Sequence, residues 1–517
     1  MRMKHHRHTL AALFLSLLAV FLAHTVATRI FDGMPHLEDE IAYVWQARLI
    51  AQNQSLSMPS PPEPKSFLVP FVVDYQGRRF GKYPPGWPVL LALGEAAGQR
   101  GWVNPLLAGL ATWLLYRLAA KIAGENVGLL SAALLLTSPF FWLNAGSLLS
   151  HLWGLVLTLV FALGWLDAFA ARPQAEAGEL PWLTAALALG ALVLTRPFSA
   201  LGVALPFALH GLYLLARGDA AVRRRLLAFG ALSAALAGLV FVWQYALTGN
   251  FFTNPYTLWW AYDKVGFGPG HGVLASGHTL RQAWLNTRFS LWVGAGDLFG
   301  WGRLSWLFIP PGLWALRRNE RAWLVFGIAP ALVVLYLGYW VGAWLFGPRY
   351  YFEALPGLIL CSAVGIRFAL GRRFPGKRDT LKGSRPVLGD SRIPWGGIRA
   401  ALVAGLVILM VILNLKFYLP PRLAMMRGLY TIEQARLAPF RRPEALALTP
   451  ALVFVRSERW MAYGALLELA RPDLTSPFIF AVDIGPQANG RVRAAFPDRR
   501  VVYYDPSSPY VFQVPAP

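Results

Sequence analysis

Long apolar segments alternate with short polar connections over the first 420 residues of the chain. Most of these segments are about 20 residues long, which is the length of a helix that crosses a hydrocarbon core of roughly 30 Å. The pattern predicts a polytopic α-helical membrane protein with about 11 transmembrane helices. The predicted spans are residues 9–28, 104–120, 127–143, 148–170, 181–195, 198–216, 226–247, 304–316, 322–341, 351–368 and 400–418.

Basic residues beside the spans gather on one predicted side, with clusters at residues 117–121, 223–225 and 317–318 and in the loop 371–399. Lys and Arg are enriched in cytoplasmic loops, so we expect a multi-pass plasma (inner) membrane protein with a cytoplasmic N-terminus. The first apolar run also has the outline of a signal peptide. We interpret it as a retained helix, because the later loops alternate correctly only if it stays.

Composition adds little beyond this class. The chain of 517 residues is 56% hydrophobic and 14% charged, with a formal net charge of +22. Such a charge in a soluble protein would suggest a nucleic-acid partner. Here the topology accounts for it, so we expect membrane lipids and no nucleic acid as partners. The one cysteine, Cys361, lies in an apolar run and cannot form an intramolecular disulfide.

The longest polar interruption is the first outer loop, residues 32–88. Residues 39–52 have the apolar spacing of an amphipathic helix, which we expect to lie on the membrane with its apolar stripe down. The stripe consists of Ile41, Val44, Trp45 and Leu49. The opposite face presents Asp39, Tyr43 and Gln46. Residues 67–80 predict a hairpin, and residues 86–98 predict a short surface or re-entrant helix that starts after two prolines.

Two later regions also lie outside the membrane by this topology. Residues 248–302 form a second outer loop that is rich in Trp, Tyr, Gly and His. After residue 420 the polarity becomes ordinary, and strand-like segments at 451–456, 477–482 and 500–504 alternate with helix-like ones. We therefore divide the chain into a transmembrane domain, residues 1–420, and a small outward-facing α/β domain, residues 421–517.

Asp39 and Glu40 are the first candidates for chemistry, because a carboxylate at the start of a surface helix can deprotonate an acceptor group. The alternative is that these acids only complement the helix dipole. Lys82 lies on a turn stiffened by Pro84 and Pro85, and suits a phosphate. Its alternative is a solvated or headgroup-binding basic loop.

Two arginines lie on the outer side, against the positive-inside trend. Arg196 precedes Pro197 amid apolar sequence, where a charge usually faces a cavity or a partner. Arg349 can clamp a phosphate bidentately. The alternatives are a snorkelling side chain for Arg196 and an internal ion pair with Glu353 for Arg349.

Histidines and metals point to no definite site. His151 begins a span on the outer side, and His271 and His278 lie in the second outer loop. No HExxH or Cys-based ligand spacing is present, so hydrogen-bonded interface histidines are the better interpretation and no metal site is indicated.

The ordered motifs resemble those of the GT-C membrane glycosyltransferases, in the branch of protein O-mannosyltransferases and aminoarabinose transferases. The matching residues are Asp39-Glu40, Lys82-Tyr83-Pro84-Pro85-Gly86, Leu194-Thr195-Arg196-Pro197 and Arg349-Tyr350. The resemblance covers residues 1–420. It implies an outward-facing site that takes a sugar from a polyprenyl-phosphate donor and transfers it to an envelope acceptor: a lipid, a glycan or a protein.

The resemblance also implies roles for residues. Asp39 would be the catalytic base with Glu40 as neighbour or substitute, and Lys82, Arg196 and Arg349 would hold the donor phosphate. Nearby side chains would contact substrate, and they are Tyr43, Tyr83, His151 and Tyr350. Single displacement would invert the sugar carbon, and no soluble cofactor would be needed.

The sequence departs from the resemblance at two positions. Relatives often have an acid where this chain has His151, and aminoarabinose transferases usually have Lys where it has Arg196. Two other functions stay open: a transporter or flippase of lipid-linked saccharides, and a non-catalytic envelope assembly protein.

Overall fold

The computed structural model describes residues 2–170, 178–371, 395–457 and 459–515. The basic loop predicted at 371–399 lies mostly outside these residues. The helices are α1 (Arg2–Arg29), α2 (Glu38–Asn53), α3 (Gly86–Ala96), α4 (Val103–Ala123), α5 (Glu125–Leu136), α6 (Pro139–Ala145), α7 (His151–Phe169), α8 (Leu180–Val193), α9 (Pro197–Arg217), α10 (Ala220–Thr248), α11 (Pro255–Trp259), α12 (Leu280–Asp297), α13 (Ile309–Leu316), α14 (Glu320–Phe326), α15 (Ile328–Tyr336), α16 (Leu355–Ala369), α17 (Trp395–Leu413), α18 (Leu419–Ala424), α19 (Pro443–Leu446) and α20 (Pro486–Ala495). The strands are β1 (Met58–Pro59), β2 (Val72–Tyr75), β3 (Arg78–Gly81), β4 (Ala451–Val455), β5 (Phe478–Val482), β6 (Arg500–Tyr504) and β7 (Phe512–Gln513).

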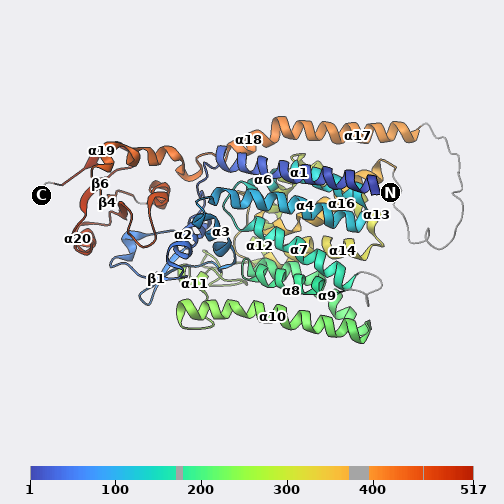
Figure 1. Ribbon diagram of the computed structural model, residues 1–517, viewed down its shortest axis with the longest axis horizontal. Helices are drawn as coiled ribbons and strands as arrows, with labels where there is room; N and C mark the ends of the chain where they lie inside the picture. The colour runs from blue at the N-terminus through green and yellow to red at the C-terminus, as the bar shows by residue number, and fades with distance from the viewer. Residues whose placement is uncertain (1, 171–177, 372–394, 458, 516–517) are drawn as a thin grey trace.

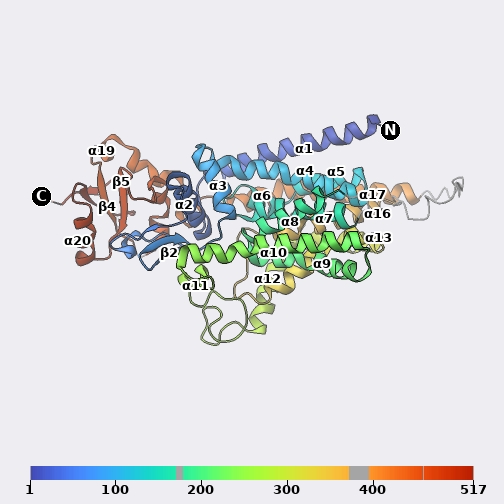
Figure 2. The same cartoon turned by 60° about the horizontal axis from the view of Figure 1, so that its bottom comes forward.

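The long helices run side by side in one bundle, and the C-terminal sheet lies at the end opposite the N-terminus (Figures 1 and 2). Among the described residues, seven helices are long and apolar enough to cross a membrane. An eighth span results if α5 and α6 count as one, although they meet at 67°. Pro139 explains this bend, because proline at the start of α6 prevents α5 from continuing.

The predicted number of about 11 spans exceeds the number of full-length helices. The predicted span at 304–316 is divided into the end of a 3-10 helix (Gly302–Trp306) and α13, and the span at 322–341 is divided into α14 and α15. These two short helices meet at Gly327, where a Cβ would lie 3.0 Å from the Pro206 side chain of α9. Short, interrupted helices therefore occupy positions where hydropathy alone predicts continuous ones.

The first outer loop has the predicted elements. Helix α2 and helix α3 form where expected, and β2 and β3 pair as an antiparallel hairpin through a turn at Gln76-Gly77. Both turn residues have positive φ (51° and 75°), the geometry that matches strand twist in two-residue hairpins.

The expected placement of α2 on the membrane is wrong. Three residues of its apolar stripe pack with the hairpin region and with two side chains of the C-terminal region. The stripe residues are Ile41, Trp45 and Leu49, and they meet Val69, Val72, Trp460 and Leu467. The opposite face is buried too, since Tyr43 and Gln46 are each only 5% exposed. Helix α2 is thus enclosed by protein on both faces, because apolar surface buried against other side chains satisfies the same pattern as apolar surface buried in lipid.

The second outer loop contains a helix that hydropathy does not reveal. Helix α12 begins at a capping box in which Thr279 and Gln282 satisfy each other's backbone N–H groups. Its sequence mixes polar and apolar residues, so it lacks the continuous apolar run of a span.

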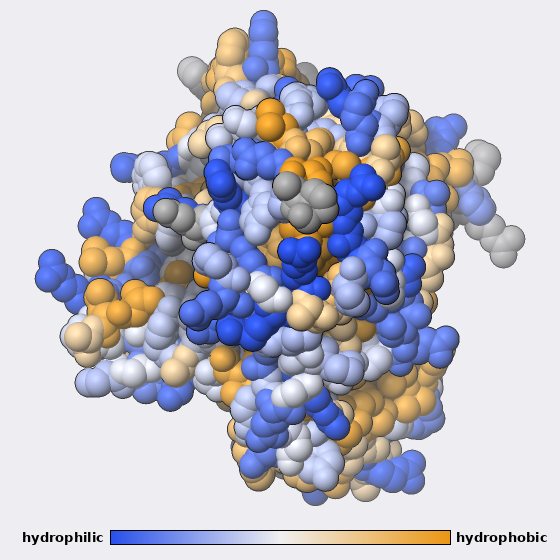
Figure 3. Space-filling model, turned by 90° about the vertical axis from the view of Figure 1, so that its left-hand side faces the viewer, coloured by the Kyte–Doolittle hydropathy of each residue, from blue (hydrophilic) through white to orange (hydrophobic). Residues whose placement is uncertain are grey.

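The three predicted C-terminal strands form, and β4 pairs in parallel with β5 and β6. The strand order is β5-β4-β6-β7, and α20 connects β5 to β6. Viewed from this end, the molecule presents a largely hydrophilic surface (Figure 3). This end therefore has the polarity of a surface in contact with water.

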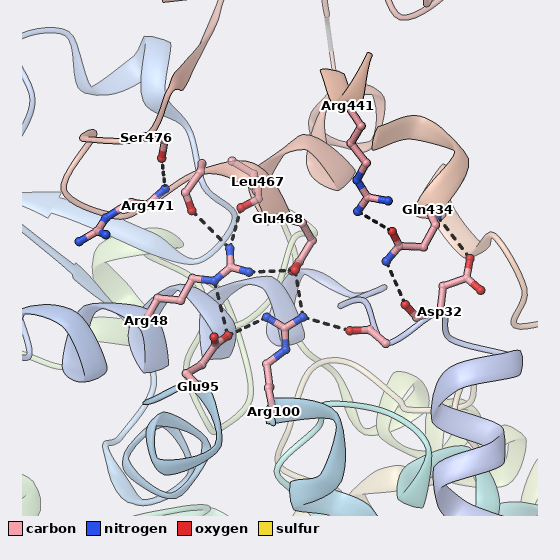
Figure 4. Close-up of polar contacts among 12 residues, drawn as sticks. Asp32, Arg48, Glu95, Arg100, Gln434, Arg441, Leu467, Glu468, Arg471 and Ser476 are labelled. Atoms are coloured by element: carbon pink, nitrogen blue, oxygen red, sulfur yellow. Dashed lines mark hydrogen bonds and ion pairs between the residues drawn. The ribbon is translucent and has the colours of Figure 1, made fainter. Parts of the chain in front are cut away.

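A network of four charged side chains attaches the C-terminal region to the first outer loop (Figure 4). Glu468 accepts from Arg48 at 2.8 Å and from Arg100 at 2.9 Å. Glu95 forms ion pairs with both arginines, with its Oε1 3.5 Å from Nε of Arg48 and 2.7 Å from Nη1 of Arg100. Since Arg48 lies on α2, this network helps to hold the helix that carries Asp39.

Removing Glu468 should loosen this attachment. Glu468→Ala leaves two nearly buried arginines short of a partner, so we expect a loss of about 3 kcal/mol of stability. Thermal unfolding in detergent micelles measures the loss, and limited proteolysis detects release of the C-terminal region. Glu433→Ala is the matched control, because its ion pair with Arg436 is exposed and should change stability by less than about 0.5 kcal/mol. Equal unfolding curves for both variants would contradict this prediction.

Candidate active site

Helix α2 is fixed at its first turn by Glu40. One carboxylate oxygen of Glu40 accepts hydrogen bonds from the backbone N–H groups of His36 (2.8 Å) and Leu37 (2.9 Å). The other accepts from the N–H of Leu148 at 2.6 Å. Burial raises the pKa of Glu40 to about 7 although these N–H groups oppose it. Glu40 thus joins α2 to the segment before α7.

Asp39, the next residue back, meets two other parts of the chain. Tyr83 donates its hydroxyl to Oδ1 at 2.5 Å, and Nη2 of Arg349 lies 3.3 Å from Oδ2. The Asp39 side chain is 24% exposed. Burial acts to raise the pKa of Asp39, but the charge of Arg349 and the hydrogen bond from Tyr83 outweigh it and hold the pKa below its usual value. Asp39 is therefore an ionised carboxylate with an exposed portion.

Lys82 lies in an aromatic enclosure. Its Nζ is 3.6 Å from the ring centre of Phe71 and 3.2 Å from Oδ2 of Asp263. The ring centres of Tyr256 and Trp260 each lie 5.1 Å from the same Nζ atom. Burial lowers the pKa of Lys82, and the charges of Asp263 and Asp39 oppose this effect.

Asp263 is a site residue that sequence reasoning missed. Besides pairing with Lys82, it accepts hydrogen bonds from Tyr339 (2.8 Å) and from the Trp340 indole (3.1 Å). Its side chain is buried. An acid amid the aromatic residues of an outer loop is the signal that could have identified it.

Arg196 pairs with Glu353, its Nε lying 2.8 Å from Oε1. Its Nη2 also donates to Ser199 at 3.2 Å. The proposed alternative of an Arg349–Glu353 pair is wrong, since Arg349 pairs with Asp39 instead. Lys82, Arg196 and Arg349 are therefore each already matched by a carboxylate.

Glu38 lies closer to this charge cluster than the sequence suggested. Burial and the charge of Asp39 raise its pKa, while Lys82, a hydrogen bond from Trp460 and Arg349 act to lower it. Of the three acids that open α2, Glu38 and Asp39 interact with the cations, whereas Glu40 binds backbone.

The remaining predicted side chains surround this cluster. The Tyr43 ring lies 4.5 Å from that of Tyr83, and its hydroxyl is 3.2 Å from Ser150 Oγ. Tyr350 stacks on Tyr336 at 4.7 Å. His151 is buried with its ring edge-on to Phe352.

Two of the sequence motifs touch through Gly86. Its N–H donates to Leu194 O at 2.8 Å, and a Cβ on Gly86 would lie 2.4 Å from Oγ1 of Thr195. This close approach brings the turn that bears Lys82 against the segment that bears Arg196.

We expect Gly86→Ala to separate these segments. Overpacking of this kind costs about 1–3 kcal/mol, and it would displace Lys82 and Arg196 relative to each other. Thermal unfolding and carrier binding measure the two effects. Gly101→Ala is the control, since a Cβ there meets nothing within 4 Å. If both alanine variants behaved alike, the close contact at Gly86 would be irrelevant.

A structural role for Glu40 predicts a different outcome from a catalytic one. Glu40→Gln puts an N–H₂ group where three backbone N–H groups converge, so we expect a loss of about 1–3 kcal/mol of stability. Turnover of the folded fraction should fall less than about tenfold, well below the effect expected of a general base. Turnover normalised to folded protein distinguishes the two, and a far larger loss would make Glu40 a chemical participant.

The described residues contain no group of three or more His, Cys, Asp or Glu side chains placed to hold a metal ion. Among the histidines, His278 is buried, stacks on Phe267 and bonds to Leu337 O at 2.9 Å.

Comparisons with known proteins identify the fold. No protein-family profile matches the chain, and no curated sequence matches it. Among solved structures, ArnT from Cupriavidus metallidurans bound to undecaprenyl phosphate aligns with a TM-score of 0.56 and 16% identity, over 95% of this chain and 89% of that one. The oligosaccharyltransferase of Archaeoglobus fulgidus, in complex with Zn and sulfate, aligns with a TM-score of 0.54 and 14% identity, over 95% and 67%. The chain therefore has the GT-C fold of membrane glycosyltransferases, as its motifs predict.

Proposed function

We propose that this GT-C-fold chain is a glycosyltransferase that moves a sugar from a polyprenyl-phosphate carrier to an envelope acceptor on the outer face of the plasma membrane. The observation that carries the proposal is the ionised Asp39 in contact with Arg349 and Tyr83, with Lys82 nearby. A partly exposed acid beside cations from distant segments suits group transfer from a phosphate.

The proposed orientation puts the N-terminus in the cytoplasm and residues 421–517 outside as a small α/β domain. The end of the bundle that holds the N-terminus also contains the ion pair between Lys121 and Asp167 and the hydrogen bond from Asn319 to the carbonyl oxygen of Ile122. The basic clusters at residues 117–121 and 317–318 therefore lie at this end, which the proposed orientation places in the cytoplasm. The Asp39 cluster belongs to the other end, with α2 and the C-terminal sheet (Figure 1). This separation supports an outer-face site.

Donor binding would exchange anions. The carrier phosphate would take Arg349 from Asp39 and Lys82 from Asp263, since both cations are now held by carboxylates. Arg196 would remain beside Glu353 and add positive potential. The exchange also activates the base: once Arg349 turns to phosphate, its charge no longer lowers the pKa of Asp39, so this pKa rises.

Transfer would then proceed in one displacement. The acceptor oxygen or nitrogen attacks the anomeric carbon, Asp39 receives the acceptor's proton, and the electron pair of the breaking bond passes to the phosphate oxygen. Arg349 and Lys82 stabilise the charge that develops on this oxygen. Inversion at the sugar carbon follows from a single displacement. No cofactor takes part in these steps.

A transporter or flippase of lipid-linked saccharides is the main competing function. It would use the same cations, but transporters place polar sites near the bilayer midplane, often on broken helices. The charged cluster here lies in the first outer loop and at helix ends, which favours transfer. A non-catalytic assembly protein would not need Asp39 to be ionised and partly exposed.

Double labelling separates these functions. Proteoliposomes receive a carrier labelled with ³²P on the phosphate and ³H on the sugar, together with an envelope extract as acceptor. We expect the two labels to part, with ³H entering the extract and ³²P staying on the carrier. Both labels crossing the bilayer together would instead identify a transporter, and no movement of either would support the assembly protein.

A further inference from the structure

A groove of about 410 Å³ lies where α12 meets residues 344–345 and α18. This volume is within the range of sites that bind small molecules. Its apolar lining includes Trp292, Trp344, Met425 and Met426. The described residues that line it include no side chain in contact with Asp39 or Lys82, so the groove is separate from the candidate active site.

Helix α12, which forms one wall of the groove, has its amphipathic pattern turned outward. Its buried residues are small or polar, among them Ala283, Thr287, Ser290 and Gly294. Its large apolar side chains are exposed, and they are Leu280, Trp284, Leu285, Phe289, Leu291 and Trp292. A helix at a water-exposed surface turns its apolar face toward the core instead. The outer face of α12 therefore meets hydrocarbon or another apolar surface.

Polar contacts fix the floor of the groove and leave it without net charge. Asp297 accepts from the Tyr418 hydroxyl at 2.9 Å and from Nε and Nη2 of Arg422, both at 2.9 Å. Nη2 of Arg422 also donates to Leu345 O at 2.9 Å. Tyr418 ends a π-helical turn, Asn414–Tyr418, and such turns are frequent at functional sites. Asp297 and Arg422 thus cancel each other's charge.

The two walls of the groove otherwise carry only positive charge. Residues 280–316 contain one acid, Asp297, and residues 395–428 contain none. Arg303 lines the groove, is exposed, and makes no ion pair among the described residues. Arg288 lies one helical turn from Trp292, on the same face of α12. The groove therefore combines apolar walls with uncompensated cations.

This combination restricts the occupant. A second copy packed by twofold symmetry would bring the same basic walls face to face, where like charges repel. A soluble anion would leave the aromatic and methionine side chains uncovered. A phospholipid matches both parts, because basic pockets between membrane helices bind lipid headgroups and apolar walls accept acyl chains. The walls hold no second acid that could receive a choline or ammonium group, so the headgroup is anionic.

We propose that this groove is a specific site for one anionic phospholipid of the surrounding membrane. The lipid phosphate binds Arg303, and the acyl chains pack on Trp292, Trp344 and Met425. The bound lipid is neither donor nor acceptor, so the inference goes beyond the proposed function and does not depend on sugar transfer.

Lipid selectivity tests the headgroup contact. Native mass spectrometry of the full-length protein, released from nanodiscs, measures the retention of dioleoyl phosphatidylglycerol and of dioleoyl phosphatidylcholine. We expect the wild type to bind one phosphatidylglycerol about tenfold more tightly, the effect of one charge-assisted contact. Arg303→Gln should lose this preference. Arg318→Gln, which removes an exposed arginine at the opposite end of the bundle, is the matched control and should keep it.

Crosslinking tests the place of binding. Phosphatidylglycerol with a photoreactive acyl chain is bound to the wild type and irradiated, and the labelled peptides are identified. Adducts should fall within residues 289–303 and 418–426, and an excess of undecaprenyl phosphate should not reduce them. This measurement needs no variant, so it decides the matter even if Arg303→Gln does not fold.

Three outcomes would overturn the inference: equal binding of the two lipids by the wild type, an unchanged preference in Arg303→Gln, or adducts outside the groove. Displacement of the label by undecaprenyl phosphate would also overturn it, since the groove would then belong to the carrier. Failure of sugar transfer in the double-label experiment would remove the proposed function alone, because lipid retention does not require transfer.

Discussion

Replacing Asp39 by asparagine should lower kcat for sugar transfer by about 10³-fold, the contribution of a positioned general base. The amide keeps the shape of the side chain and can still accept from Tyr83, but it cannot take the acceptor's proton. It also no longer binds Arg349 as an ion pair, so the donor phosphate meets less competition for the guanidinium. We therefore expect the KM for the carrier to stay level or fall while kcat collapses.

Initial rates with a radiolabelled carrier measure both parameters. Asp167→Asn is the matched control, because that carboxylate pairs with Lys121 at the opposite end of the bundle. It should retain kcat within about twofold, as expected of a surface ion pair. A kcat for Asp39→Asn within tenfold of the wild type would remove Asp39 from the chemistry.

Replacing Arg349 by lysine should lower kcat/KM for the carrier by about 10²–10³-fold, the effect of losing one transition-state donor. Lysine keeps a positive charge but not the planar fork that pairs with Asp39 in the free protein and would bind the phosphate in the carrier complex. Arg349→Met, which also removes the charge, should lose more.

The pH dependence of kcat/KM in Arg349→Met tests the pairing of Arg349 with Asp39 independently of the rate itself. Arg349 is the largest influence that lowers the pKa of Asp39, against the burial that raises it. The reaction needs Asp39 ionised, so weakening this influence moves the acid limb of the kcat/KM profile to higher pH. An acid limb that stayed in place or moved lower in Arg349→Met would contradict the pairing. Arg318→Lys, at an exposed arginine, is the control and should leave the profile unchanged.

Local patterns predicted the elements of the first outer loop. The turn at Gln76-Gly77, the prolines before Gly86 and the apolar spacing of α2 act over a few residues, so the sequence alone reveals the hairpin, α3 and α2. The three C-terminal strands were predictable for the same reason. Helix α12 was not, because its residues mix polar and apolar character without a continuous run.

Partnerships across the chain could not be predicted. Glu353 is four residues from Arg349, yet it binds Arg196, and Lys82 binds Asp263 from another loop. Adjacent residues on a helix differ by about 100° in direction, so whether Glu38 or Glu40 faces the cations depends on what packs against α2. The packing of the apolar stripe of α2 likewise depends on contacts with the C-terminal region, and local sequence does not reveal such contacts.

The central claim is that a lipid phosphate replaces carboxylates on Arg349 and Lys82. The most direct test is a cryo-EM map of the protein in nanodiscs with undecaprenyl phosphate. The account predicts phosphate density in hydrogen-bond contact with both cations, with Asp263 moved off Lys82 and Asp39 left facing the carrier. Phosphate density elsewhere, with both ion pairs intact, would contradict it.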